Sequence, residues 1–161
     1  MLTGAIDKNI YPLRHRFAKL IADGAFKPYR AVHRKHCGYR LDNPDAEAES
    51  YAKLLGMARV CLADTSKWEY SAEKYHEIPA VGSVLCGNVP GERQSEFRKF
   101  MLEVNVGWSD EQIVGEIKRL LDDQERIDVM SQDGREYVHS RFTVDRYAER
   151  LLDAMSGENH A

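Results

Sequence analysis

The stretch RVCLADTS, residues 59–66, decides the fold class of this chain. Its residues 60–63 are apolar without alternation, and residues 83–88, SVLCGN, show the same pattern one unit later. Continuous apolar runs of this length are typical of strands that helices cover on both faces of a parallel sheet. Both stretches therefore predict central strands of such a sheet.

Strand and helix candidates alternate along the rest of the chain. Further strand candidates lie at residues 1–6, 29–33 and 101–106. Helices are predicted from Pro12 to Gly24, after an N-cap at Asp45, from near Lys74, and from Ser109 onward. Strands that alternate with helices imply βαβ units, and right-handed crossovers place helices on both faces. The chain is therefore predicted to be an α/β, Rossmann-like open parallel sheet with a helical C-terminal tail.

Length and charge fit one ordinary globular domain. The chain has 161 residues and a net charge of -3. We expect residues 1–155 to form a single domain and residues 156–161 to be a frayed tail. A domain built to bind nucleic acid carries a clear basic excess, which this chain lacks. We therefore expect no nucleic-acid partner, although a small basic pocket for one phosphate group remains compatible with this charge.

The cysteines and the first residues favour a cytoplasmic protein. Cys37, Cys61 and Cys86 are odd in number and widely spaced, which predicts reduced thiols rather than disulfides or a metal site. Residues 1–9, MLTGAIDKN, lack the basic and apolar regions of a signal peptide. No apolar run approaches the roughly 20 residues of a membrane span. We therefore expect a cytoplasmic location and no membrane partner.

Three loops are expected to meet at one edge of the sheet. They are residues 3–9, 33–39 and 64–74, and each follows a strand candidate. Open parallel sheets bind ligands just outside the carboxyl ends of their strands. The topology alone therefore predicts a binding site built from these loops.

Charged residues near this edge suit a nucleotide. Arg14 and Lys74 fall near helix starts, where free backbone N–H groups and the helix dipole favour an anion such as a diphosphate. Glu77 lies one turn beyond Lys74, and its carboxylate can accept hydrogen bonds from adjacent sugar hydroxyls. The same Lys–Glu spacing also occurs in solvated surface pairs worth about 0.2–0.5 kcal/mol. The residues alone leave both interpretations open.

Other chemistries have less support in the sequence. His33 and His36 would need further ligands to hold a metal ion, so we expect no metal. The sequence contains no nucleophile-elbow, P-loop or dinucleotide fingerprint, so we expect no cofactor. Trp68 and Tyr70 suit either stacking on a base or sugar, or ordinary packing.

Three segments together resemble one glycosyltransferase domain. Residues 73–90, EKYHEIPAVGSVLCGNVP, are similar to the donor-site segment of GT-B glycosyltransferases, in their second, nucleotide-sugar-binding domain. Residues 133–155 resemble the tail helices of the same proteins, and residues 3–17 resemble the start of that domain in members of the spore-maturation type. The resemblance covers residues 1–155 and implies half of a GT-B fold.

The resemblance implies roles for two glutamates. Glu77 matches the Glu that holds the ribose hydroxyls of the donor nucleotide. Glu69 matches the first Glu of the E-x(7)-E signature and is the candidate catalytic residue that faces the transferred sugar. The chain departs from the family after Glu69, because residues 70–72 are YSA where the family has Gly-Phe-Gly.

The resemblance also implies how the diphosphate is held. Arg14 and Lys74 would bind it, Gly4 would let the backbone approach it, and Gly82 would allow close packing behind the site. Fixed cations would stabilise the charge that develops on the leaving diphosphate, without a metal. GT-B enzymes use two domains, so this chain is expected to need an N-terminal acceptor domain or a partner subunit and to be inactive alone. Whether it forms a homo-oligomer is left open.

Three other interpretations remain open. The first is a non-enzymatic α/β module that binds a nucleotide or another phosphorylated ligand at the same edge. The second is a flavodoxin-like flavin or signalling domain, and the third is a purely structural domain with a solvated charged helix. The fold alone supports none of these functions over the others.

Overall fold

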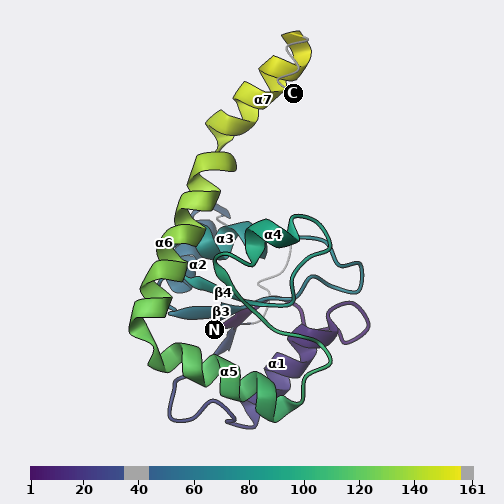
Figure 1. The fold of residues 1–161 in the computed structure, drawn as a ribbon, viewed down its shortest axis with the longest axis vertical. Helices are drawn as coiled ribbons and strands as arrows, with labels where there is room; N and C mark the ends of the chain where they lie inside the picture. The colour runs from purple at the N-terminus through teal and green to yellow at the C-terminus, as the bar shows by residue number, and fades with distance from the viewer. Residues whose placement is uncertain (35–43, 157–161) are drawn as a thin grey trace.

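The computed structural model describes residues 1–34 and 44–156 and is an α/β fold built on one sheet (Figure 1). The sheet has the strand order β2-β1-β3-β4-β5, and every neighbouring pair is parallel. Its strands are β1 (Leu2–Thr3), β2 (His33–Arg34), β3 (Val60–Leu62), β4 (Val84–Gly87) and β5 (Met101–Glu103). The prediction of an open, Rossmann-like parallel sheet is confirmed.

Helices cover both faces of this sheet. They are α1 (Pro12–Ala22), α2 (Pro44–Gly56), α3 (Lys74–Ala80), α4 (Gln94–Phe97), α5 (Asp110–Asp122), α6 (Gln124–Arg141) and α7 (Val144–Ser156). One buried cluster joins α1 and α5 to one face, through side chains such as Phe17 and Ile117. A second buried cluster joins α2, α3 and α4 to the other face, through Leu55, Ile78 and Phe97. The predicted two-sided covering is therefore present.

Alternate residues of the central strands enter opposite clusters. Val60 and Leu62 of β3 belong to the α1–α5 cluster, whereas Cys61 between them belongs to the α2–α4 cluster. In β4, Cys86 joins the first cluster and Leu85 the second. Because both faces are buried, every position of these strands is apolar, which explains the unbroken runs in the sequence. Both cysteines are free and buried, as expected.

Local sequence signals set several helix starts. Pro12 occupies the first turn of α1, where its missing N–H is not needed. Ser109 caps α5 reciprocally: its hydroxyl accepts from the Gln112 N–H at 3.2 Å, and the Gln112 side chain accepts from the Ser109 N–H at 2.8 Å. The N-cap predicted at Asp45 is wrong, because α2 begins at Pro44 and so includes Asp45 in its first turn. A carboxylate there still complements the positive helix end.

The last two helices differ in how much they bury. α6 buries Ile127, Met130, Gly134 and Val138. By contrast, α7 buries none of its residues 144–156 and extends away from the sheet in Figure 1. The body of the fold therefore ends with α6.

Two predictions fall partly on residues that the structure does not describe. Of the loop predicted at 33–39, only His33 and Arg34 are described, and they form β2. His36 and Cys37 lie outside the described residues. Of the tail predicted at 156–161, only Ser156 is described, as the last residue of α7.

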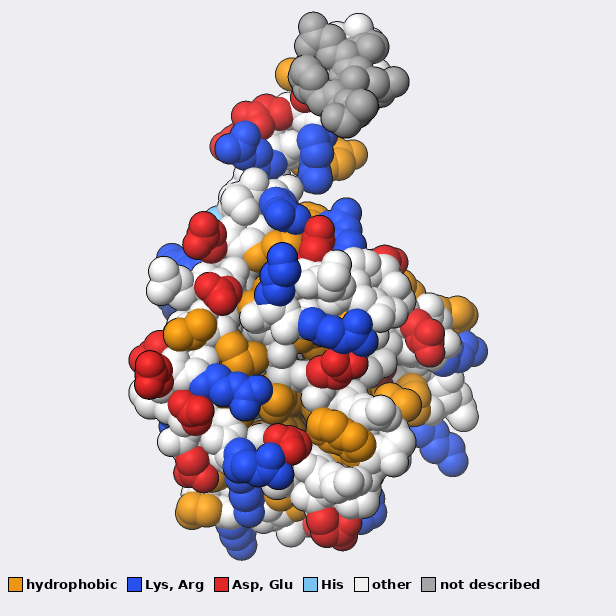
Figure 2. All heavy atoms as spheres, in the orientation of Figure 1, with side chains coloured by type: hydrophobic (Ala, Val, Ile, Leu, Met, Phe, Trp, Pro, Cys, Tyr) orange, Lys and Arg blue, Asp and Glu red, His pale blue; other side chains and the backbone are white. Residues whose placement is uncertain are grey.

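Charges of both signs mix on the molecular surface. Figure 2 shows one face, on which acidic and basic side chains are interspersed. This face therefore lacks the single-sign field that attracts a polyanion. Within residues 1–34 and 44–156, no helix combines the length and the apolar character needed to cross a membrane.

Candidate functional site

The topology of this sheet predicts a binding site at the carboxyl ends of β1 and β3, a region that we call the β1–β3 crevice. The two strands are neighbours, with Leu2 opposite Leu62, although α1, β2 and α2 separate them in the chain. β2 lies on one side of β1 and β3 on the other, so the connections after β1 and β3 lead in opposite directions across the sheet. Such a switch point is where open parallel sheets bind ligands. Residues 4–11 follow β1 there, and residues 63–73 follow β3.

Two cationic side chains approach Gly4, the first residue after β1. Gly4 has a φ of +94°, a left-handed conformation that favours glycine. A Cβ atom at this position would lie 3.2 Å from Lys74 Cε and 3.3 Å from Arg14 Nη1. Arg14 comes from α1 and Lys74 is the first residue of α3. The fold therefore brings together three of the residues that the sequence analysis assigned to the diphosphate.

Arg14 is almost fully buried and firmly held. Only 3% of it is exposed, and its Nη1 donates to the carbonyl oxygen of Ala5 at 3.2 Å. Its guanidinium lies over the Tyr11 ring, 4.0 Å from the centroid, and its Nε has no hydrogen-bond partner among the described residues. Its backbone N–H, expected to be free for an anion, donates instead to Asp64 Oδ2 at 2.7 Å. An anion here would therefore interact with the charge of the guanidinium rather than with this N–H.

Asp64 ties α1 to the loop that follows β3. It is 1% exposed, and its Oδ1 accepts a hydrogen bond from the Ser66 N–H at 2.5 Å. Together with the bond to the Arg14 N–H, this gives the carboxylate two backbone donors from opposite sides of the crevice. The first turn of α1 and the loop after β3 are therefore joined through one buried side chain.

A phenol links the second cation to Glu77. Lys74 Nζ donates to the Tyr51 hydroxyl at 2.8 Å, and that hydroxyl donates to Glu77 Oε2 at 3.3 Å. Burial lowers the pKa of Lys74; the nearby Glu77 carboxylate opposes this effect, and the Arg14 guanidinium adds to it. An anion bound beside both cations would favour the protonated form of Lys74.

Glu69 lies apart from this group. It is exposed, in the turn after β3, with a φ of +56°. Its carbonyl oxygen accepts a hydrogen bond from the Gly91 N–H at 2.6 Å, which fixes the turn. In the part of the chain that the structure describes, its carboxylate has no share in the hydrogen bonds that join Lys74 to Glu77. The role that the resemblance implies for Glu69 stays a prediction.

Gly82 lies at the opposite edge of the sheet. It falls between the end of α3 and the start of β4, with a φ of +81°. Its carbonyl oxygen accepts a hydrogen bond from Ser131 Oγ of α6 at 2.6 Å. α3 runs from the carboxyl edge of the sheet back to the amino edge. Gly82, which follows α3, is therefore separated from the crevice by the length of that helix. The structure therefore does not bring Gly82 together with the other assigned residues.

Three polar residues at the crevice were not assigned from the sequence: Thr3, Tyr51 and Asp64. Tyr51 could not be assigned from the sequence, because its ring suits ordinary packing on a helix and the partners of its hydroxyl come from distant segments. Asp64 offered a usable signal, because it is the first polar residue after a buried parallel strand.

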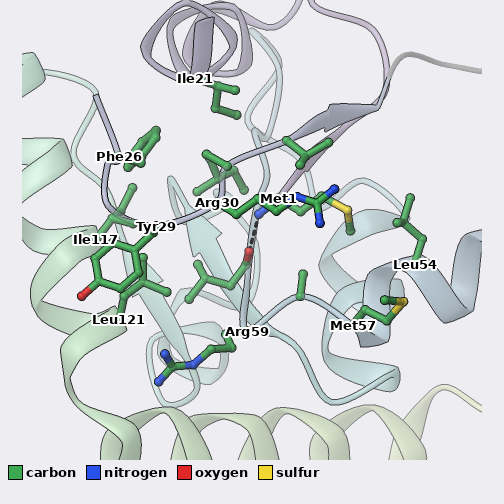
Figure 3. Close-up of a pocket in the computed structure, with 15 residues that line it drawn as sticks. Met1, Ile21, Phe26, Tyr29, Arg30, Leu54, Met57, Arg59, Ile117 and Leu121 are labelled. Carbon is green, nitrogen blue, oxygen red and sulfur yellow. Dashed lines mark hydrogen bonds between the residues drawn. The ribbon is translucent and has the colours of Figure 1, made fainter. Parts of the chain in front are cut away.

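A hollow lies at the amino edge of the sheet, away from the crevice (Figure 3). It has a volume of about 430 Å³, and its lining includes Leu121 of α5 on one side and Met57 after α2 on the other. Among the described residues that line it, Arg30 and Arg59 are the only ones with charged side chains. An apolar hollow of this kind suits an apolar group, so a phosphorylated ligand is better matched to the crevice.

The crevice places two cationic side chains, Arg14 and Lys74, near the Glu77 carboxylate. No group of three potential metal ligands occurs among residues 1–34 and 44–156. A scan against models of known protein families finds no match to this chain, and a search of curated proteins finds none either. The residues at the crevice are therefore what indicates a function for this chain.

Proposed function

We propose that this chain is the donor-binding domain of a GT-B glycosyltransferase and binds a nucleoside diphosphate sugar at the β1–β3 crevice. The observation that carries the proposal is the approach of two cations, Arg14 and Lys74, to Gly4. Glu77 lies beside them, joined to Lys74 through one hydroxyl group. The resemblance of residues 73–90 to a donor-site segment supports the same proposal.

The diphosphate would lie next to the two cations. Opposite charges about 4 Å apart interact several times more strongly in a partly shielded crevice than in bulk water. Lys74 carries a lowered pKa, so an anionic partner would stabilise its charged form. Gly4 has no side chain, which lets a phosphate oxygen approach the backbone closely.

Glu77 would hold the ribose. Its Oε2 accepts one hydrogen bond from Tyr51, and an ionised carboxylate has about four lone-pair sites in all. The remaining sites can accept hydrogen bonds from two adjacent hydroxyls. Residues three apart on a helix are neighbours on its surface, so Lys74 and Glu77 would meet consecutive parts of one nucleotide.

Transfer would break the bond between the sugar C1 and the diphosphate oxygen, and form a bond between C1 and the oxygen of an acceptor hydroxyl, whose proton would pass to the released diphosphate. The electron pair of the broken bond leaves with the diphosphate, and the fixed cations stabilise that charge without a metal. Glu69, on the loop after β3, is the candidate to face the sugar. The acceptor would bind a separate domain or subunit, so the chain alone is expected to bind the donor without transferring the sugar.

Calorimetric titration with UDP, GDP, ADP and dTDP, and with their common sugar conjugates, tests this proposal. We expect saturable binding of one diphosphate and at least about tenfold weaker binding by Glu77→Ala, since hydrogen bonds to charged groups contribute about 1.5–3 kcal/mol. Glu136→Ala is the matched control, because Glu136 is exposed in the middle of α6. Its affinity should equal that of the wild type.

Two results would contradict the proposal. The first is the absence of binding by every nucleotide at millimolar concentration. The second is tight binding that the attached sugar does not alter and that Glu77→Ala leaves unchanged. That second result would favour the non-enzymatic phosphate-binding module.

A further inference from the structure

Tyr51 reaches the crevice from the interior of α2. Side chains of an α-helix lean toward its N-terminus. The N-terminus of α2 follows β2 and so lies at the carboxyl edge of the sheet. The Tyr51 hydroxyl is thereby carried to the end of β1, where it lies 3.1 Å from Thr3 Oγ1. α2 thus adds one polar atom to the crevice.

The hydrogen-bonding capacity of this hydroxyl is fully used. A phenol has one donor and two acceptor lone pairs. It donates to Glu77 Oε2 at 3.3 Å and accepts from Lys74 Nζ at 2.8 Å. The contact with Thr3 must then be one in which the threonine hydroxyl donates. The three bonds together fix the direction of the proton on Tyr51, which points to Glu77.

The environment keeps Tyr51 protonated. Burial raises its pKa to about 12, and the Glu77 carboxylate raises it as well. The group therefore remains a neutral phenol at physiological pH, and its proton stays available to Glu77. The same ring faces the ammonium of Lys74, whose Nζ lies 5.2 Å from the ring centroid.

The phenol stands between two opposite charges on one helix. Lys74 and Glu77 have the spacing at which helical residues can form a direct ion pair. Among the described ion pairs none joins these two side chains, and each bonds to Tyr51 instead. An ammonium has three N–H donors, so two remain after the bond to Tyr51. The carboxylate likewise keeps acceptor sites that a direct ion pair would occupy.

We infer that Tyr51 is a positioning residue that holds Lys74 and Glu77 apart and aimed at one ligand, which couples recognition of the diphosphate to recognition of the ribose hydroxyls. This inference rests on the proposed function. Without the hydroxyl, Lys74 and Glu77 would pair with each other. The crevice would then lose affinity for a nucleoside diphosphate and also lose its sensitivity to the sugar hydroxyls.

Tyr51→Phe tests the inference because it removes the hydroxyl and keeps the ring. The measurement is the ratio of Kd values for the best-bound nucleoside diphosphate and its 2′,3′-dideoxy counterpart. The wild type should prefer the ribose form by about tenfold, and Tyr51→Phe should bring that ratio close to one. If the role of Tyr51 were merely structural, Tyr51→Phe would weaken the binding of both ligands equally and leave the ratio of their Kd values unchanged. Tyr147→Phe, on the exposed face of α7, is the matched control.

A double-mutant cycle with Glu77→Gln completes the test. If Tyr51 acts through Glu77, Tyr51→Phe should have no further effect on the ratio in the Glu77→Gln background. A Tyr51→Phe protein that melts like the wild type and keeps the full ratio would overturn the inference and leave the proposed function intact. A wild type that binds no nucleoside diphosphate would overturn the proposed function and this inference with it.

Discussion

The two edges of the sheet differ in what they bury. At the carboxyl edge, Arg14, Asp64 and Ser66 are buried polar residues, and the Asp64 carboxylate accepts hydrogen bonds from the backbone N–H groups of the other two. At the amino edge, the hollow of Figure 3 is lined mainly by apolar side chains. In a parallel sheet the helices that connect the strands run opposite to them, so helix N-termini gather at the carboxyl edge and helix C-termini at the amino edge. The direction of the strands therefore predicts that an anion would bind at the carboxyl edge, although the apolar hollow lies at the amino edge.

The largest expected effect comes from Asp64→Ala. This change leaves the buried N–H groups of Arg14 and Ser66 without an acceptor, and each unsatisfied donor costs about 1–3 kcal/mol. We expect the free energy of unfolding to fall by about 3 kcal/mol, as measured by urea denaturation. At the amino edge, Arg59→Ala should change it by less than about 0.5 kcal/mol, because Arg59 is exposed. If Asp64→Ala and Arg59→Ala lowered the free energy of unfolding equally, the two edges would not differ in how much their polar residues stabilise the fold.

Lys74→Met should separate binding from stability. It removes a cation from the crevice, so affinity for a nucleoside diphosphate should fall by about tenfold or more. The same change removes a charge that burial disfavours, so the melting temperature should not decrease. Calorimetry and thermal unfolding of the same sample measure both. A large loss of stability with unchanged affinity would mean that Lys74 is structural.

The lowered pKa of Lys74 also predicts a pH dependence. Between its value in the folded protein and its usual value of 10.5, the unfolded chain holds a proton that the folded chain has lost. This group therefore makes stability increase as pH rises through that window. Diphosphate affinity should decrease over the same range, because the ammonium is the binding form. Titrations from neutral to alkaline pH should show this decrease in the wild type and not in Lys74→Met.

Two glycines provide the smallest and most direct comparison. Gly4→Ala and Gly82→Ala both force alanine to adopt a positive φ, which costs about 1–2 kcal/mol. At Gly4 the new Cβ would crowd Arg14 and Lys74, whereas at Gly82 it would meet Ser131 Oγ at an ordinary 3.5 Å. We expect similar losses of stability and a loss of diphosphate affinity only for Gly4→Ala. If Gly82→Ala weakened binding as much, the amino edge would belong to the site.

Prediction from the sequence succeeded where the signal was local. The apolar run at residues 60–63 identified a buried strand, and Pro12 and Ser109 marked helix starts that the structure contains. The N-cap predicted at Asp45 was wrong because α2 begins at Pro44, and sequence patterns are least informative about the exact residue at which a helix begins. Gly82 was assigned to the site from its neighbours in the sequence, although the helix before it runs away from the crevice.

The sequence was enough to predict the alternation of helices and strands and the burial of both sheet faces, because these follow from the spacing of apolar residues along short segments. It also placed Arg14 and Lys74 at one edge, since parallel strands share that edge. The folded structure was needed to show that both cations approach Gly4 and that the hydroxyl of Tyr51 lies between Lys74 and Glu77. These contacts join residues that are far apart in the chain. They depend on the strand order and on the direction in which the Tyr51 side chain leaves α2. No local sequence pattern encodes either of these.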